Sequence, residues 1–458
     1  MFRIASTACF VVSLSNYLFS QPCDLLPILE DGLYHSTVAS SLLPPLDLIE
    51  RESKRRSAIV DDNQLKALYL CLQSEALAEL GRKEDALAAS RTAMSLHPTS
   101  DRSTVTQARC LARMRQVTEA IGLCNAALSN NPDYVPALAL RATLRSQGLG
   151  QHDLALEDAN HAIEINSRDA RSYFIRSLIL HRLRRASDAL KDIETHLHLS
   201  ATGMIGNEHV VHTQKGIILA DQHRYDEARR AFELGLSADK KFYHAAKGLW
   251  GCYNEMKRHT DALLAAQRMR DIDSNNLETV KASAISYFNT HRYDEAKVYF
   301  CKWSSLRLND SLPVSMIAAC EFATGQYANA VEHYDEALKI SPDAYRIRLA
   351  KAIALSNCKD EDFRDPKLAM REVAIVLSRQ DANRIDTEAF MLANVIQYSC
   401  GQRTAAIASI NEKLNNDLNL SDDEITALRS LANSFARNEK TEFTIPSVVA
   451  DSSNFGWK

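Results

Sequence analysis

The hexapeptide HRYDEA occurs twice in this chain, at residues 223–228 and again at residues 291–296. The two copies lie 68 residues apart, which is twice 34. An alanine recurs at about the same interval along most of the chain, each time after a polar turn and at the start of an apolar run. These alanines are Ala86, Ala120, Ala155, Ala189, Ala228, Ala262, Ala296, Ala330, Ala369 and Ala405. A fixed period of about 20 to 50 residues is the signature of a repeat architecture.

The apolar residues around each alanine are spaced as in α-helices. A second apolar run precedes each alanine, and most of these runs have a small residue at the same place. Two packed helices approach closely only where the facing side chains are small, so each unit is predicted to be helix A, a short turn and helix B. The small residues of helix A are Ser74, Ala108, Ala142, Ser177, Gly216, Ala284, Ala318, Ala352 and Ala393. The 14 Gly and 11 Pro among 458 residues are too few for a turn-rich β fold.

The sequence GQYANAVEHYDEALKISPD at residues 325–343 resembles the helix-B consensus of the tetratricopeptide repeat (TPR) family. The resemblance extends over about residues 67–415. It implies an all-α fold, a right-handed superhelical solenoid of about ten helix-turn-helix repeats, with helix A on the concave surface and helix B on the convex one. It also implies binding to other proteins, but this solenoid serves many unrelated processes, so the resemblance names no partner.

Seven segments are predicted along the chain. Because neither helix of a repeat can bury its apolar face alone, the two ends of the array need capping elements. Ser421 and Glu424 have the spacing of a capping box, which favours a helix start there. The predicted segments are residues 1–23, a signal peptide or disordered segment; 24–66, N-terminal capping helices; 67–200, TPR repeats 1–4; 201–208, a link; 209–415, TPR repeats 5–10; 421–440, a C-terminal capping helix; and 441–458, a disordered tail.

Cysteine usage and the N-terminus indicate different locations. The 10 Cys form no CxxC pair and most lie within amphipathic runs, which is typical of reduced cysteines in a cytoplasmic protein. The alternative is export through an N-terminal signal peptide, since Arg3 is followed by an uncharged, mostly apolar stretch to Phe19. Beyond this stretch, no run of about 20 apolar residues predicts a membrane span. The net charge of −4 predicts no nucleic-acid partner.

Arginine is concentrated in the helix-A segments of repeats two to four, whereas the helix-B segments of the same repeats carry mostly acidic residues. Given the concave helix-A surface of the family, this pattern predicts a basic groove for an acidic peptide, a partner helix or a C-terminal carboxylate, bound by bidentate arginine contacts. The predicted partner-binding residues are Arg102, Arg109, Arg113, Arg145, Arg171, Phe174, His181 and Arg182. The alternative is that these arginines pair with neighbouring helix-B acids or remain in solvent, and that Phe174 packs against its neighbours.

Catalytic motifs are absent from the sequence, which has no GxxxxGK[ST], no GxGxxG after a strand, no HExxH and no GxSxG. Glu208, His209 and His212 lie close together in the sequence, but no further ligand completes a metal site. The sequence therefore predicts a protein that is not an enzyme and that uses no cofactor and no metal.

The predicted function is a non-catalytic protein–protein interaction scaffold or adaptor. It would bind a partner peptide or helix in the concave groove and form part of a multiprotein assembly. The long array without an appended domain favours this function. Two alternatives stay open: a regulatory subunit of an enzyme complex, for example a ubiquitin-ligase-type assembly, and an exported envelope-assembly factor. The sequence also leaves the oligomeric state open.

Overall fold

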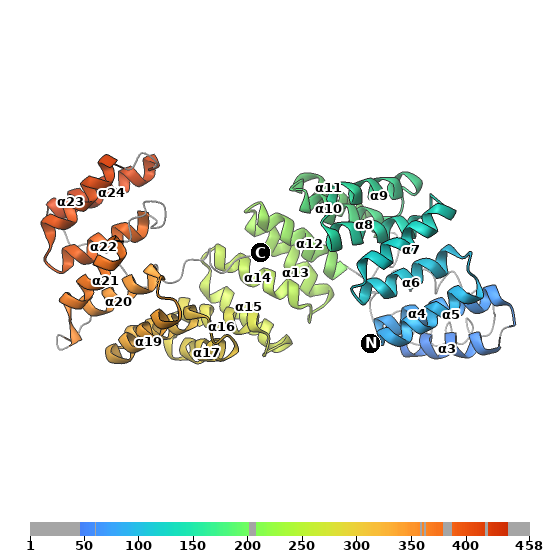
Figure 1. The fold of residues 1–458 in the computed structure, drawn as a ribbon, viewed down its shortest axis with the longest axis horizontal. Coiled ribbons are helices and arrows are strands. Elements are labelled where there is room, and N and C mark those ends of the chain that lie inside the picture. Colours follow the sequence, from blue (N-terminus) through green and yellow to red (C-terminus); the bar gives the residue numbers. More distant parts are fainter. Residues whose placement is uncertain are drawn as a thin grey trace, which may run out of the picture. The chain divides into compact units, whose positions relative to one another are not determined.

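The structure is a computed structural model that describes residues 46–59, 61–200, 208–357, 360, 363–378, 387–416 and 420–437. Over these residues the chain forms 22 α-helices, α3 to α24, and no β-strand (Figure 1). The predicted all-α fold is confirmed. Several predicted segments lie outside the described residues, namely 1–23, 24–45 of the N-terminal cap, 201–207 of the link, and 441–458 of the tail.

The chain divides into two compact units, Met1–Gly248 and Leu249–Lys458, with the boundary inside α14. The helices of the first unit are α3 (Leu46–Ile59), α4 (Asn63–Glu79), α5 (Lys83–Leu96), α6 (Asp101–Arg113), α7 (Val117–Asn130), α8 (Val135–Leu149), α9 (His152–Ile165), α10 (Ala170–Arg182), α11 (Ala186–Ser200), α12 (Glu208–Asp221), α13 (Tyr225–Ala238) and the beginning of α14 (Tyr243–Glu255). The helices of the second unit are the remainder of α14, α15 (His259–Ile272), α16 (Leu277–Asn289), α17 (Tyr293–Leu306), α18 (Ser311–Ala323), α19 (Tyr327–Ile340), α20 (Tyr345–Asn357), α21 (Pro366–Ser378), α22 (Thr387–Ser399), α23 (Arg403–Asn416) and α24 (Asp422–Ala436).

Consecutive helices form the repeats, from α4 and α5 in repeat one to α22 and α23 in repeat ten. The even-numbered helices α4 to α22 are helix A, and the odd-numbered helices α5 to α23 are helix B. Within a unit, helix B packs against helix A of its own repeat and against helix A of the next repeat, as α5 does with α4 and α6. Each apolar face is thereby buried partly within its own repeat and partly by its neighbours in the stack.

The recurring alanines mark the fourth residue of helix B. Nine of the ten predicted alanines, from Ala86 to Ala369, are at most 1% exposed and stand at this place in their helices. The tenth, Ala405, is exposed, and its neighbour Ala406 is fully buried. Since α23 begins at Arg403, its fourth residue is Ala406. The predicted mark at Ala405 is therefore wrong by one residue.

The turns between helix A and helix B contain a residue with a left-handed backbone. Glycine provides it in four repeats, and non-glycine residues adopt it in five others. In L-residues this conformation brings the side chain close to the backbone and costs about 1–2 kcal/mol. The residues with positive φ are Gly81, Arg115, Gly150, Arg184, His223, Lys257, His291, Gly325 and Gly401.

The HRYDEA hexapeptide is explained by this turn. His223 supplies the left-handed residue, with φ 59°, and its Nδ1 lies 2.8 Å from the hydroxyl oxygen of Tyr225. Arg224 then pairs with Glu227 at 2.7 Å on the first turn of α13. Ala228 is the fully buried residue of the contact with helix A. The second copy has the same contacts, so the hexapeptide encodes a turn, a helix start and a packing position.

A close approach of helices occurs around Phe232 of α13, which is fully buried. A Cβ atom added at Gly216 of α12 would lie 2.7 Å from the Phe232 ring, and Gly248 faces the same ring. Glycine is therefore required at both places, because the Phe232 ring occupies the space that the methyl group of an alanine would need.

The last described helix, α24, packs against α22 and α23. It begins at a capping box, in which the Ser421 hydroxyl accepts from the backbone N–H of Glu424 and the Glu424 carboxylate accepts from the Ser421 backbone. Leu428, Leu431 and Phe435 are its buried residues, and the Phe435 ring stacks on Tyr398 with a centroid distance of 4.2 Å. Within the second unit, α24 thus covers the apolar surface of repeat ten.

Candidate functional site: the helix-A surface of repeats one to five

The predicted partner-binding residues lie on α6, α8 and α10, the A helices of repeats two to four. Consecutive A helices contact one another, α4 with α6, α6 with α8, α8 with α10 and α10 with α12. Their outward residues therefore form one surface, which we call the helix-A surface and define as α4, α6, α8, α10 and α12. Residues that are one period apart in the sequence are neighbours on it.

Two of the predicted arginines are paired with acids of the preceding A helix. Arg109 Nη1 lies 2.8 Å from Glu75 Oε1, with side chains 18% and 11% exposed. Arg113 pairs with Glu79 and also donates from Nη1 to the Ala78 carbonyl at 3.5 Å. Each ion pair joins positions 34 residues apart, so the partners occupy the same place in successive repeats. The sequence prediction considered the charges of repeats two to four and therefore missed these acids of repeat one.

His181 of α10 is held between two residues of α12. Its Nε2 lies 2.8 Å from Asp221 Oδ2, while Gln214 Nε2 lies 3.3 Å from its Nδ1. Both ring nitrogens of His181 are therefore engaged by side chains of α12. The acid again comes from the neighbouring A helix, although Asp221 lies 40 residues further along the chain.

Arg145 has a different environment, since it faces helix B of its own repeat. Its Nη1 donates to Asp158 Oδ2 at 2.7 Å and to the Leu154 carbonyl at 3.4 Å. Asp158 also receives two hydrogen bonds from Arg141. This contact is the one expected if Arg145 serves packing between helices α8 and α9.

The remaining predicted residues differ in exposure. Arg182 at the end of α10 is exposed and has no ion-pair partner in the described part of the chain. Arg102 and Arg171 are half-buried and engaged in contacts of their own. Phe174 is half-buried, packs beside the core residues of repeats four and five, and has its ring centroid 5.5 Å from that of His196. Arg182 is thus the predicted cation that is most accessible to a ligand.

The helix-A surface carries acids on α4 and α12 as well as cations on the A helices between them. Glu75 and Glu79 on α4 face Arg109 and Arg113 on α6, and His181 on α10 faces an acid on α12. The surface is therefore not uniformly basic. A partially exposed ion pair contributes only about 0–1 kcal/mol, so an incoming carboxylate can replace Glu79 at Arg113, whose side chain is 44% exposed.

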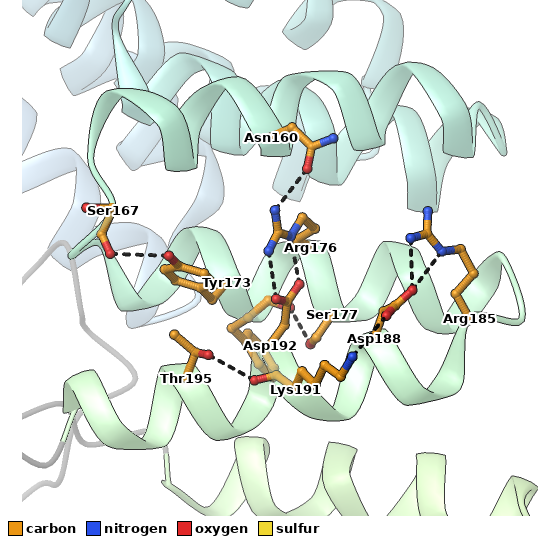
Figure 2. Close-up of polar contacts among 11 residues, drawn as sticks. Asn160, Ser167, Tyr173, Arg176, Ser177, Arg185, Asp188, Lys191, Asp192 and Thr195 are labelled. Atoms are coloured by element: carbon orange, nitrogen blue, oxygen red, sulfur yellow. Dashed lines mark hydrogen bonds and ion pairs between the residues drawn. The ribbon is translucent and has the colours of Figure 1, made fainter.

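Polar contacts also join the helices of the helix-A surface to the B helices packed against them (Figure 2). Figure 2 shows Arg176 of α10 between Asp192 of α11 and Asn160 of α9. Its Nε and Nη2 donate to the two oxygens of Asp192 at 2.7 and 2.8 Å, and its Nη1 donates to Asn160 Oδ1 at 3.0 Å. The hydrogen bonds to Asp192 raise the pKa of Arg176. We call such a charge, bound by the B helices before and after it, a three-helix clasp.

The three-helix clasp recurs with different residues. In repeat three, Arg141 donates to both oxygens of Asp158 and to Asn125. In repeat nine, Lys351 lies 2.6 Å from Asp335 and 2.9 Å from Glu372. Burial disfavours the charged ammonium, but these two hydrogen bonds outweigh it and raise the pKa of Lys351.

Repeat eight has the clasp with reversed charge. Glu321 of α18 is 1% exposed and lies 2.6 Å from Lys297 Nζ on α17 and 2.7 Å from His333 Nδ1 on α19. The clasps fix neighbouring repeats to each other.

A cavity of about 250 Å³ beside Arg176 is lined by Asp188 and Asp192 together with their cationic partners, so its charges are already paired.

The histidines considered as metal ligands and the cysteine Cys124 are packed within the fold. Within the described residues, no group of three or more His, Cys, Asp or Glu side chains could hold a metal ion. The His209 ring packs edge-on against Phe242 with centroids 4.6 Å apart, and burial lowers the pKa of His209 and of His212. Burial raises the pKa of the Cys124 thiol to about 12, so this thiol is not a nucleophile near neutral pH.

None of the described helices has the length and apolar character needed to cross a membrane.

Tandem helix pairs with buried small residues at each contact define an α-helical repeat protein. Family models described as tetratricopeptide repeat match residues 71–135, 213–276 and 316–344. The chain therefore contains tetratricopeptide repeats, as the sequence resemblance predicted, and these repeats support the coarse prediction of a protein-interaction scaffold. No curated protein matches the sequence.

Solved structures of several helical-repeat proteins are similar to parts of the chain. YrrB, described as a TPR protein with an unusual peptide-binding site, is 21% identical over 41% of this chain and 95% of that chain, with a TM-score of 0.38. A tetratricopeptide repeat protein from Parabacteroides merdae is 18% identical over 55% of this chain and 97% of that chain, with a TM-score of 0.40. Yeast Tom70 is 12% identical over 93% of this chain and 96% of that chain, with a TM-score of 0.39. These likenesses identify no partner.

Proposed function

We propose that the chain is an adaptor that binds an acidic peptide or helix of a partner protein along the helix-A surface of repeats two to four. The observation that carries this proposal is the pairing of Arg109 with Glu75 and of Arg113 with Glu79. Both guanidinium groups are positioned to bind carboxylates that approach across the surface. A partner carboxylate can take the position of Glu79, because the side chain of Arg113 is 44% exposed.

Arg182 extends the proposed contact to repeat four. It is exposed and has no ion-pair partner among the described residues, so it binds a carboxylate without first releasing another. Arg113 and Arg182 both stand in the last turn of an A helix, in α6 and α10. An acidic segment that follows this edge of the surface would meet one arginine and then the other.

The test is a comparison of two doubly substituted proteins in affinity capture from native extract. The variant Arg113→Glu/Arg182→Glu reverses two charges on the helix-A surface. The matched control Arg115→Glu/Arg184→Glu makes the same change two residues further on, in the turns. We expect the control to capture the same amount of each partner as the unsubstituted protein. The first variant is expected to capture at least about 90% less of each partner, which corresponds to a tenfold loss of affinity.

The proposed surface is refuted if both variants capture the same partners as the unsubstituted chain. The identity of the captured proteins also separates the alternatives. A catalytic chain among them would support the role of regulatory subunit in an enzyme complex, and envelope proteins would support an exported assembly factor.

A further inference from the structure

A second cavity lies far along the sequence from the helix-A surface, in the unit Leu249–Lys458. It has a volume of about 540 Å³ and lies between α21, helix B of repeat nine, and the end of α22, helix A of repeat ten. Its walls combine three kinds of side chain: the apolar Met370 and Leu377, the cations Lys367 and Arg371, and the amides Gln397 and Gln402.

The amide of Gln397 has an unmet hydrogen-bond acceptor at this cavity. Gln397 is 9% exposed, and its buried Oε1 has no hydrogen-bond partner among the residues that the structure describes. Its Nε2 is used, since it donates to Gln402 Oε1 at 3.4 Å. A buried acceptor without a partner is unfavourable, so a ligand that presents a donor to Gln397 Oε1 gains a hydrogen bond.

The two cations stand at the mouth of the cavity. Lys367 and Arg371 are exposed, lie four residues apart on one face of α21, and have no ion-pair partner within the described part of the chain. The adjacent acid, Glu372, is buried and already binds Lys351 and Arg348. Among the described residues, the charge at the mouth is therefore positive, which favours a ligand with a carboxylate.

We propose that this cavity binds an extended acidic–apolar segment of a partner protein. A side-chain carboxylate of the segment lies between Lys367 and Arg371, and a neighbouring aliphatic side chain packs on Met370 and Leu377. A backbone N–H of the segment donates to Gln397 Oε1. An extended peptide offers these three groups at short spacing, because backbone donors and side chains alternate along it. The chain would thus have a docking site independent of the helix-A surface.

The test is peptide selection on the full chain, followed by affinity measurement. The probe is a phage-displayed library of random nonapeptides, with Lys367→Glu/Arg371→Glu used for counter-selection. We expect the enriched peptides to share an Asp or Glu within about three residues of Leu, Ile, Val or Met. A synthetic peptide of the enriched sequence, measured by fluorescence anisotropy, is then expected to bind this variant at least tenfold more weakly.

Two further variants complete the test. Gln397→Leu, which removes the unmet acceptor, is expected to weaken the peptide by about threefold or more without lowering the melting temperature. Arg268→Glu/Lys339→Glu, the same charge change at exposed positions of α15 and α19, is expected to bind as the unsubstituted chain does. The proposal is overturned if no acidic–apolar sequence is enriched, or if the enriched peptide binds Lys367→Glu/Arg371→Glu with undiminished affinity. Arg113→Glu/Arg182→Glu leaves this binding unchanged, so the two proposed sites fail or succeed separately.

Discussion

Arg176 and Asp192 form a two-point ion pair in which Nε and Nη2 donate to the two carboxylate oxygens at 2.7 and 2.8 Å. The remaining Nη1 donates to Asn160, so three helices from two successive repeats meet at one guanidinium group. This arrangement explains part of the arginine content of these A helices, because some of the arginines bind acids of neighbouring helices rather than a partner protein. It also makes the contact between repeats directional, because hydrogen bonds require a defined geometry and apolar packing alone does not.

Asp192→Ala is expected to destabilise repeats three and four by about 3 kcal/mol, since it leaves the Arg176 charge without its partner. The control is Asp188→Ala, which removes the exposed pair with Arg185 and is expected to cost less than about 1 kcal/mol. Urea denaturation followed by circular dichroism, with hydrogen exchange of α9 to α11, measures both. Equal effects of the two substitutions would contradict the clasp.

Ala406→Leu is expected to lower the stability of repeat ten by about 1–3 kcal/mol, because a larger side chain has no room at a fully buried helix contact. Ala405→Leu, one residue earlier and exposed, is expected to change it by less than about 0.5 kcal/mol. Thermal unfolding of the two variants compares adjacent positions of one helix. The register described for α23 is incorrect if Ala405→Leu is the more harmful change.

Gly216→Ala is expected to destabilise the first unit by at least about 1 kcal/mol, since the added methyl group meets the Phe232 ring. Gly122→Ala in α7 has open space around the new Cβ and is expected to stabilise by up to about 1 kcal/mol, through helix propensity. Melting temperatures should therefore shift in opposite directions. Adding Phe232→Leu to Gly216→Ala should recover part of the loss by making room for the methyl group.

Arg115→Gly is expected to raise the stability of repeat two by about 0.5–1 kcal/mol. Arg115 has φ 63° in an exposed turn, where glycine relieves the steric cost but loses more conformational entropy on folding. Arg115→Ala retains the Cβ atom and is the matched control, with little change expected. Denaturation midpoints in urea distinguish the two, and a stabilising Arg115→Ala would point to charge rather than backbone conformation.

Stability of the first unit is expected to fall as the pH decreases from about 7.5 to about 5.5. Burial lowers the pKa of His209 and of His212 in the folded chain, whereas the unfolded residues titrate near about 6.5. The unfolded state therefore binds more protons in this range, and the contribution of both residues, complete above about 6.5, is lost as the pH falls through the folded pKa. His209→Gln/His212→Gln should flatten the dependence of the urea midpoint on pH, and an unchanged slope would contradict this assignment.

The packing positions were predictable because they depend on residues close together in the sequence. Ala296 is buried by its own helix pair, and the 34-residue period identifies it without any knowledge of its neighbours. The prediction failed at Ala405 because the preceding repeat has an irregular length and the start of α23 depends on its turn at Gly401. A period locates a repeat, but a turn decides the register of its helix.

The charged positions were not predictable in the same way. Arg109 and Arg113 were identified as candidate ligand residues, yet nothing near them in the sequence indicates Glu75 and Glu79 as partners. Applying the period to the acids as well as to the alanines would have found them. The assignment of these arginines to partner binding stays a prediction, which the charge reversals at Arg113 and Arg182 test.

The amino-acid sequence by itself determined that this chain is a stack of helix pairs, where the contact alanine of each helix B lies to within one residue, and which small side chains lie at the contacts. These properties follow from a pattern of small and apolar residues that recurs in each repeat. Only the tertiary structure decided which charges meet across repeats, which residue of each clasp is buried, and where α21 and α22 leave a cavity. Those properties arise when helices from different repeats come together, because the strength of a charge interaction depends on distance and burial in space rather than on separation along the chain.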